Sequence, residues 1–270
     1  MQEQLWKNIV AVRESSPLVH NITNYVVMNN TANALLAVGA SPIMAHAQSE
    51  MEDMVAIIGA LVINIGTLDE YWTESMHLAI AKAKAVGKPW ILDPVGAGAT
   101  PFRNKVLESI ISHQPTVIRG NASEIMALAR MNNSTKGVDS TNTTAEAQAA
   151  AVNLMKSLGS VVCVSGATDL VLHQDQVVKL TNGHALMARV TGMGCTATSL
   201  IGACCAANPT DSFAATVAAM ALMGVAGEMA AEKSPGPGSL QLHFLDILYS
   251  ITEEEFKSRL KLETNDAATL

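Results

Sequence analysis

The chain has 270 residues, of which 49% are hydrophobic, 15% charged and 4% aromatic. This length suits one large α/β domain or two small ones, and the composition can form a large aliphatic core. The net charge of −7 argues against nucleic acid and anionic membranes as partners, because both attract basic surfaces. An anionic cofactor stays possible, and the low charge content indicates that another subunit covers some apolar surface.

The cysteines and the first residues together indicate a reducing compartment. The four cysteines form no C-x-x-C pair and no Cys/His spacing of a zinc site: Cys163, Cys195, Cys204 and Cys205. The first residues lack the apolar run of a secretion signal. We therefore expect reduced thiols and a cytoplasmic protein.

Helical and extended patterns alternate along the first two thirds of the chain. Apolar spacing predicts helices at 2–15, 25–38, 49–58, 69–86, 102–112, from 121 onward, and at 144–158. Short runs rich in Val, Ile and Leu predict strands at 18–20, 41–45, 60–66, 89–95, 115–120 and 161–165. This alternation predicts a mostly parallel central sheet with helices on both faces, an α/β fold in a single domain over 1–270.

The last third is predicted to be mainly helical. A hairpin is expected at 170–178, a short strand at 186–190, and helices at 195–207, 210–232, 240–250 and 252–260. The helix at 210–232 is long enough to span a membrane, but its many alanines carry little hydrophobicity and favour a buried core helix. The polar stretch 132–142 is expected to be mobile.

A glycine-rich turn at 191–194 organises the prediction of function. Thr191-Gly192-Met193-Gly194 follows the predicted strand at 186–190 and leads into a helix that begins at Cys195. Glycines leave the backbone amides of such a turn accessible, and a helix N-terminus adds unpaired donors and partial positive charge. The turn is therefore a candidate anion site, suited to a phosphoryl group during its transfer.

Polar residues also end most of the predicted strands. Ligands bind beyond the carboxyl ends of the strands in an open parallel sheet, so these side chains are expected along one edge: Asn21 to Asn24, Asn64, Asp93, Arg119, Ser165 and Gly192. Each has a purely structural alternative. The Asn21–Asn24 patch can cap a helix, Asp93 can start a turn, and Glu124 with Asn121 matches a capping box.

Phosphoryl transfer gives these residues separate roles. Asp93 and Glu124 are the candidate ligands of Mg²⁺, partly through water, since magnesium keeps much of its hydration shell. Arg119 offers planar donors to phosphate oxygens, and Ser165 before Gly166 would touch a nucleotide phosphate. Ser165 can equally be an ordinary turn serine.

Cys195 differs from the other three cysteines, for which buried and inert is the default interpretation. It stands at the predicted start of a helix, where a thiolate is favoured. Cys195 is therefore the candidate base for the substrate hydroxyl, and a weak base would suffice for a loose transition state.

Several motifs together resemble the hydroxyethylthiazole kinase family. They are His20-Asn-Ile-Thr-Asn24, Gly39-Ala-Ser-Pro-Ile-Met44, Ile65-Gly-Thr67, Asp93-Pro-Val-Gly96, Arg119-Gly-Asn-Ala-Ser-Glu-Ile125, Thr191-Gly-Met-Gly-Cys195, Gly236-Pro-Gly-Ser239 and His243-Phe-Leu-Asp246. The resemblance covers roughly residues 16–250. It implies a three-layer ribokinase-like fold and ATP-dependent phosphorylation of 4-methyl-5-(2-hydroxyethyl)thiazole, a thiamine-salvage step, by a homotrimer with substrate sites at subunit interfaces.

The resemblance also implies the role of each site residue. Met44 and Gly192 would contact the thiazole, with Asn21 and Asn24 beside it, while Arg119, Ser165 and Gly194 would contact ATP. Asp93 and Glu124 would lie near Mg²⁺, and Cys195 would stand where related sugar kinases have an aspartate. Met193 departs from the Thr or Ser usual at its position, so a polar contact of the anion turn is expected to be missing.

Two other functions fit parts of the sequence. Gly192-Met-Gly-Cys-Thr-Ala197 matches the G-x-G-x-x-A form of a dinucleotide fingerprint, but it comes late in the chain rather than in an early βαβ unit. A kinase of the same superfamily acting on another small hydroxymethyl substrate is the stronger alternative. The cysteine in place of aspartate and the Asn21–Asn24 patch argue against it.

Overall fold

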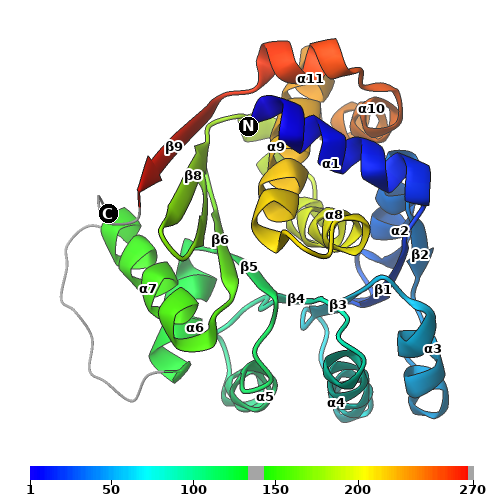
Figure 1. Ribbon diagram of the computed structural model, residues 1–270, viewed down its shortest axis with the longest axis vertical. Coiled ribbons are helices and arrows are strands. Elements are labelled where there is room, and N and C mark those ends of the chain that lie inside the picture. The colour runs from blue at the N-terminus through cyan, green and yellow to red at the C-terminus, as the bar shows by residue number, and fades with distance from the viewer. Residues whose placement is uncertain (133–142, 267–270) are drawn as a thin grey trace.

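A computed structural model of the chain describes residues 1–132 and 143–266. Of the stretch 132–142, predicted to be mobile, all but Asn132 lies outside the described residues. Figure 1 shows a curved sheet with helices on both of its faces, which confirms the predicted α/β class.

Within the described residues, nine strands form one sheet in the order β2-β1-β3-β4-β5-β6-β7-β8-β9. Their bounds are β1 Leu18–Ile22, β2 Ser41–Ile43, β3 Ala60–Asn64, β4 Trp90–Asp93, β5 Val117–Asn121, β6 Val161–Ser165, β7 Asp169–His173, β8 Gln176–Leu180 and β9 Leu262–Asp266. Every pairing from β2 to β6 is parallel, and every pairing from β6 to β9 is antiparallel. The carboxyl ends of β1 to β6 therefore share one edge of the sheet.

The helices divide into two layers. One layer is α1 Gln2–Ser15, α2 Met28–Val38, α8 Met193–Ala207, α9 Ser212–Glu232, α10 Pro237–Ser250 and α11 Glu253–Arg259. The other is α3 Met51–Ile57, α4 Glu70–Ala85, α5 Pro101–Ile111, α6 Ala122–Asn132 and α7 Thr143–Leu158. Figure 1 shows these two groups on opposite sides of the sheet.

Alternation along the strands explains why the sheet needs both layers. In β3, Ala60 and Val62 pack with the α8–α9 side, whereas Leu61 and Ile63 pack with the α3–α4 side. Successive side chains of a strand point to opposite faces, so a strand that is apolar at every position is stable only when both faces are covered.

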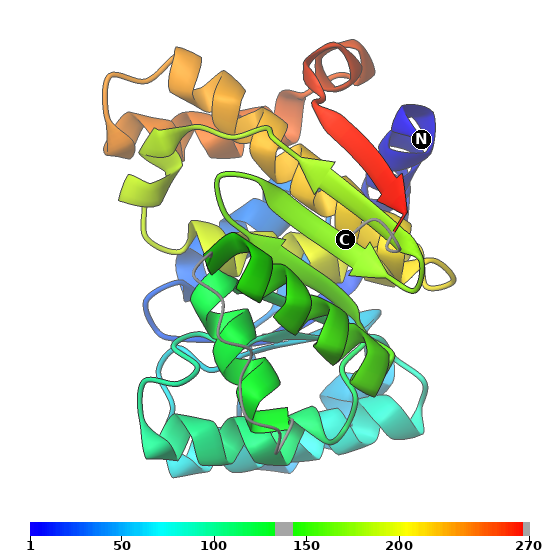
Figure 2. The ribbon, with the colours of Figure 1, turned by 90° about the vertical axis from the view of Figure 1, so that its left-hand side faces the viewer.

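The structure differs from the prediction before the glycine turn, at the start of α8 and at 262–266. Residues Ala185–Arg189 form a 3₁₀ helix, η2, instead of a strand, and helix α8 begins at Met193 instead of Cys195. Strand β9 was not predicted at all. Figure 2 shows β9 beside the hairpin of β7 and β8, where it pairs with β8 although more than 80 residues separate them.

Helix α9 is long and apolar enough to cross a membrane by length and composition, but it lies in the core. In its 18-residue apolar window, 89% of the residues are buried inside the protein. Since a buried core helix passes the same test, α9 fits the predicted core helix.

Candidate active site

The strand ends converge on the first turn of α8. Asn64 and Asp93 are register partners in β3 and β4, and Asn121 pairs with Ser165 across β5 and β6. Gly192 is the N-cap residue of α8, with a φ of 83° that favours glycine, and Cys195 is the third residue of the helix. Asn64, Asp93 and Ser165 of the predicted set therefore lie at the same edge of the sheet as the start of α8.

Asn64 is the central residue of a buried hydrogen-bond network. Its Nδ2 donates to Asp93 Oδ2 at 2.7 Å and to Cys195 Sγ at 3.1 Å. Asn24 Nδ2 donates to Asn64 Oδ1 at 2.9 Å and lies 3.5 Å from Cys195 Sγ. Two side-chain amides thus fix the sulfur atom relative to the Asp93 carboxylate.

The environment of Cys195 reverses its expected ionisation. Burial, and then the neighbouring Asp93 carboxylate, raise the pKa of the Cys195 thiol to about 11, although the amides of Asn64 and Asn24 and the charge of Arg119 act in the other direction. The prediction of a thiolate at the helix N-terminus was therefore wrong. At neutral pH Cys195 is a neutral thiol that accepts hydrogen bonds from the two amides.

Asp93 is a buried carboxylate with one oxygen unpaired. Its Oδ2 accepts hydrogen bonds from Asn64 and from Thr198 Oγ1, the latter at 2.9 Å, whereas its Oδ1 is buried without a partner among the described residues. Burial raises the pKa of Asp93 to about 6, with Arg119 opposing the shift and Glu124 adding to it. An unpaired carboxylate oxygen in this position is available to a cation or its water.

Glu124 makes the capping contacts that the sequence left as an alternative. Its Oε2 accepts from the Asn121 amide at 2.9 Å, while Asn121 Oδ1 accepts from the Glu124 amide at 3.0 Å. Its Oε1 accepts from the Gly96 amide at 3.0 Å. Both oxygens keep lone pairs for water, so these contacts are compatible with a water-mediated metal role.

Arg119, Ser165 and Gly194 line one cavity of about 660 Å³. Arg119 Nη2 donates to Ser165 Oγ at 2.6 Å, and its Nε is buried without a partner among the described residues. A Cβ on Gly194 would lie 2.6 Å from Arg119 Nη1, so the guanidinium lies directly on the helix backbone. All three residues predicted to contact ATP thus face the same cavity.

The residues predicted to contact the thiazole are not among those that line that cavity, although Gly192 directly precedes Met193 and Gly194, which do. Gly192 packs against Val27, and Met44 lies half-buried just after β2. Asn21 is fully buried, donates to Val19 O and accepts from Ser199 Oγ at 2.7 Å. Asn21 therefore holds α8 to the sheet, whereas Asn24, which is also buried, contacts Asn64 and Cys195.

Arg103 is a site neighbour that the sequence did not single out. From α5 it donates to the carbonyl of Ile65, to that of Val95 at 2.9 Å and to that of Gly66 at 2.6 Å. Arg103 therefore holds the two loops that directly follow Asn64 at the end of β3 and Asp93 at the end of β4. An arginine in an ordinary amphipathic helix gives no sequence signal for this role.

No group of three or more metal-ligating His, Cys, Asp or Glu side chains occurs in residues 1–132 and 143–266. A metal here would rest on Asp93 and Glu124 with water or phosphate oxygens completing its shell, as magnesium commonly does. The dinucleotide fingerprint is not supported, because η2 precedes the glycine turn where that motif requires a strand.

The arrangement of one mostly parallel sheet between two helix layers is a ribokinase-like fold. A ribokinase-like superfamily protein from Enterococcus faecalis shares it with a TM-score of 0.63 at 14% identity, covering 92% of this chain and 94% of that one. The pyridoxal kinase of Staphylococcus aureus in complex with pyridoxal shares the fold with a TM-score of 0.62 at 14% sequence identity, and the match covers 92% of this chain and 98% of that one.

Nearer relatives define the family. The model of the hydroxyethylthiazole kinase family matches residues 9–254. Hydroxyethylthiazole kinase from Syntrophus aciditrophicus is 55% identical over 96% of this chain and 97% of its own. The structure of hydroxyethylthiazole kinase from Pyrococcus horikoshii OT3 matches with a TM-score of 0.91 at 42% identity, covering 97% of this chain and 99% of that one. The chain belongs to the hydroxyethylthiazole kinase family.

Proposed function

We propose that this protein phosphorylates the hydroxyl group of 4-methyl-5-(2-hydroxyethyl)thiazole with ATP, a reaction of thiamine salvage. The observation that carries the proposal is the single cavity into which Arg119, Ser165 and Gly194 face, next to the first turn of α8. An arginine and free helix amides suit the phosphates of a nucleotide. Membership of the family supports the thiazole alcohol as the acceptor.

The acceptor oxygen would attack the γ-phosphorus, the bond to the bridging oxygen of ADP would break, and ADP would leave. Cys195, together with Asn24, would hold the acceptor hydroxyl near the first turn of α8. Because the thiol is neutral at pH 7, we infer that the hydroxyl proton leaves late, onto the transferred phosphoryl group. Met44 and Gly192 would then bind the thiazole ring.

The residues at the edge of the sheet fit Mg²⁺ on the strength of the unpaired Asp93 Oδ1 beside Glu124. When bound, Mg²⁺ would neutralise charge on the transferred phosphate. Asp93 would hold it directly or through water, and Glu124 through water, because both Glu124 oxygens already accept backbone amides.

We further propose a homotrimer in the cytoplasm, with active sites at the subunit interfaces. Apolar side chains are exposed directly beside the site: Tyr25 is 60% and Val26 64% exposed, one and two residues beyond Asn24. Exposed apolar groups next to a binding site are typical of a surface that another subunit covers.

The test is ADP release from the purified protein with ATP, Mg²⁺ and hydroxyethylthiazole. We expect release that depends on the thiazole and on Mg²⁺, with no release above background when either is omitted. Pyridoxal in place of the thiazole serves as the comparison acceptor. Faster release with pyridoxal would replace the proposal with a kinase for another hydroxymethyl substrate.

A further inference from the structure

We infer that Glu228 of α9 is a positioning residue for nucleotide binding, because it fixes the segment that forms one wall of the cavity. The inference rests on the proposed use of this cavity by ATP. The wall is the segment 182–188, whose Asn182, Gly183, His184 and Met187 line the same cavity as Arg119 and Ser165. From here on, this segment is called the cavity wall.

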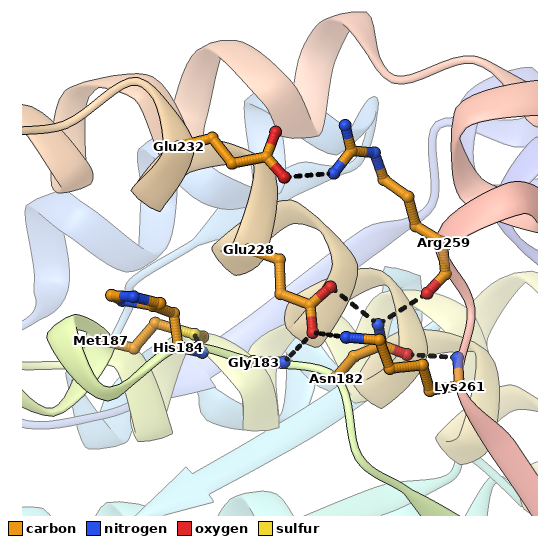
Figure 3. Close-up of polar contacts among 8 residues, drawn as sticks. All are labelled: Asn182, Gly183, His184, Met187, Glu228, Glu232, Arg259 and Lys261. Carbon is orange, nitrogen blue, oxygen red and sulfur yellow. Dashed lines mark hydrogen bonds and ion pairs between the residues drawn. The ribbon is translucent and has the colours of Figure 1, made fainter.

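The cavity wall has no regular hydrogen-bond ladder at its start, since β8 ends at Leu180 and η2 begins at Ala185. Its first residues are held instead by Glu228. Glu228 Oε1 accepts from the Gly183 amide at 3.0 Å, and Glu228 Oε2 accepts from Asn182 Nδ2 at 3.1 Å. Figure 3 shows the Glu228 side chain reaching from α9 to both residues.

Asn182 extends the connection to the C-terminal segment. Its Nδ2 also donates to the carbonyl of Arg259 at 2.9 Å, and its Oδ1 accepts from the Lys261 amide at 2.7 Å. These contacts fix which end of the Asn182 amide faces Glu228. Only an acceptor at the Glu228 position satisfies the donor that Asn182 presents.

The surface of α9 is shaped for the cavity wall to lie on it. A Cβ on Gly224 would lie 2.7 Å from Asn182 Cβ, and a Cβ on Gly227 would lie 2.2 Å from Met187 Sδ. Both distances are closer than side-chain contacts allow. Two glycines and one carboxylate on consecutive turns of α9 therefore set the position of the wall.

Glu228 is suited to this role by its ionisation and burial. Hydrogen bonds from Lys261, Gly183 and Asn182 outweigh partial burial and lower the pKa of Glu228, so it is a carboxylate at neutral pH. Its side chain is 15% exposed. Lys261 Nζ, 2.9 Å from Oε1, balances the charge from the solvent side and does not touch the cavity.

Glu232, one turn further along α9, provides a matched control. It pairs with Arg259 at 2.6 Å on the surface, its side chain is 58% exposed, and it makes no contact with the cavity wall (Figure 3). Glu228→Gln and Glu232→Gln thus remove the same charge from the same helix. Only Glu228→Gln places an amide donor against the Asn182 amide or the Gly183 N–H.

The experiment compares the two variants with the unsubstituted protein in the ADP-release assay, varying ATP and the thiazole separately. For Glu228→Gln we expect the KM for ATP to rise roughly 10- to 100-fold, the scale of one lost charged hydrogen bond, with kcat and the thiazole KM nearly unchanged. Glu232→Gln should leave all three constants nearly unchanged. Unfolding temperatures are measured alongside.

Gly227→Ala keeps the inference testable if Glu228→Gln folds poorly, because its methyl group displaces only the flexible tip of Met187. It too should raise the KM for ATP without a matching loss of kcat. Equal ATP constants in Glu228→Gln and Glu232→Gln, or a lower kcat and unfolding temperature with an unchanged KM for ATP, would overturn the inference. If the unsubstituted protein uses no ATP, the proposed function is wrong as well.

Discussion

At the scale of single residues, tertiary contacts decide the chemistry of the site. A helix N-terminus lowers the pKa of an accessible cysteine, but Cys195 is packed beneath two asparagine amides and beside Asp93. Desolvation destabilises the thiolate by more free energy than the N-terminal turn of the helix stabilises it, so the thiol stays protonated. A neutral cysteine can still position a hydroxyl group.

Three substitutions of Cys195 separate positioning from proton acceptance. We expect Cys195→Ala to lower kcat about 10- to 100-fold, below the usual range for a full general base, with thiazole binding preserved. Cys195→Ser should recover most of that loss if positioning is the role, because its hydroxyl keeps the hydrogen bonds. Cys195→Asp should remain active, since a carboxylate accepts hydrogen bonds from both amides.

Single-turnover rates and calorimetric thiazole titration measure these effects. A Cys195→Ser protein as slow as Cys195→Ala would contradict a positioning role and favour proton acceptance by sulfur. Alanine at full rate would remove Cys195 from the mechanism.

Which residues meet was predictable, but what each one does there was not. The ends of parallel strands share an edge, so a polar residue ending a strand is placed by topology, as Asp93 and Arg119 are. Asn64 and Thr198 owe their roles to the distance of α8 from β3 and β4, because Asn64 donates to Cys195 and Thr198 donates to Asp93. Sequence spacing carries no information about that distance.

At the scale of elements, the first turn of helix α8 contributes both to the network around Cys195 and, through Gly194, to the cavity that Arg119 lines. Gly194 is the second residue of α8, and its missing side chain leaves room for the Arg119 guanidinium. The helix start was predicted two residues late, because glycines are poor helix formers and were assigned to the turn. The structure shows that close approach of an arginine, rather than a turn, accounts for the second glycine.

Gly194→Ala should therefore impair nucleotide use with little effect on folding. Its Cβ would displace the end of a flexible side chain, which costs little stability, but Arg119 would leave its place beside Ser165. We expect the KM for ATP to rise about 10-fold, the effect of roughly 1.4 kcal/mol. Initial-rate kinetics at varied ATP measure it.

Gly238→Ala is the matched control for that substitution. Gly238 is also the second residue of a helix, α10, and a Cβ there would meet nothing within 4 Å. It should leave the KM for ATP unchanged. Equal effects of the two substitutions would show that helix propensity, and not the place of Arg119, underlies the result.

Elements with a periodic pattern were predicted well, and those without one were not. The parallel strands are apolar at almost every position, so β3 and β6 were found within one or two residues. Strand β9, Leu-Glu-Thr-Asn-Asp, is polar and forms only because β8 offers an open edge. The segment before the glycine turn is apolar enough for a strand, yet it forms η2, most of which belongs to the cavity wall.

At the scale of the whole molecule, covering both faces of the sheet places ionisable groups in the core. Burial raises the pKa of both Asp93 and Asp169 to about 6, although Arg119 acts against each shift. An unfolded chain would release these protons near pH 3.8. The folded protein therefore carries a destabilising term above pH 6, of the kind often tolerated at functional sites.

Asp93→Asn isolates one such term. Its amide oxygen can take the place of Oδ2 and accept from Asn64 and Thr198, while its NH₂ group takes the place of the unpaired Oδ1. A raised pKa in the folded state contributes stability that is complete below pH 3.8 and is lost as the pH rises through 6. The unfolding free energy of the variant minus that of the unsubstituted protein should thus grow with pH.

The expected growth between pH 4 and 7 is about 2.4 kcal/mol, which is most of the roughly 3 kcal/mol that a rise from 3.8 to about 6 represents at about 1.36 kcal/mol per pKa unit. Chemical denaturation at four pH values without Mg²⁺ or nucleotide measures it. Asp175→Asn, in the exposed turn between β7 and β8, is the surface control with which the pH dependence of Asp93→Asn is compared. If the unfolding free energies of Asp93→Asn and the unsubstituted protein change in parallel with pH, folding does not raise the pKa of Asp93. The carboxylate would then be stabilised by groups other than Asn64, Thr198 and Arg119.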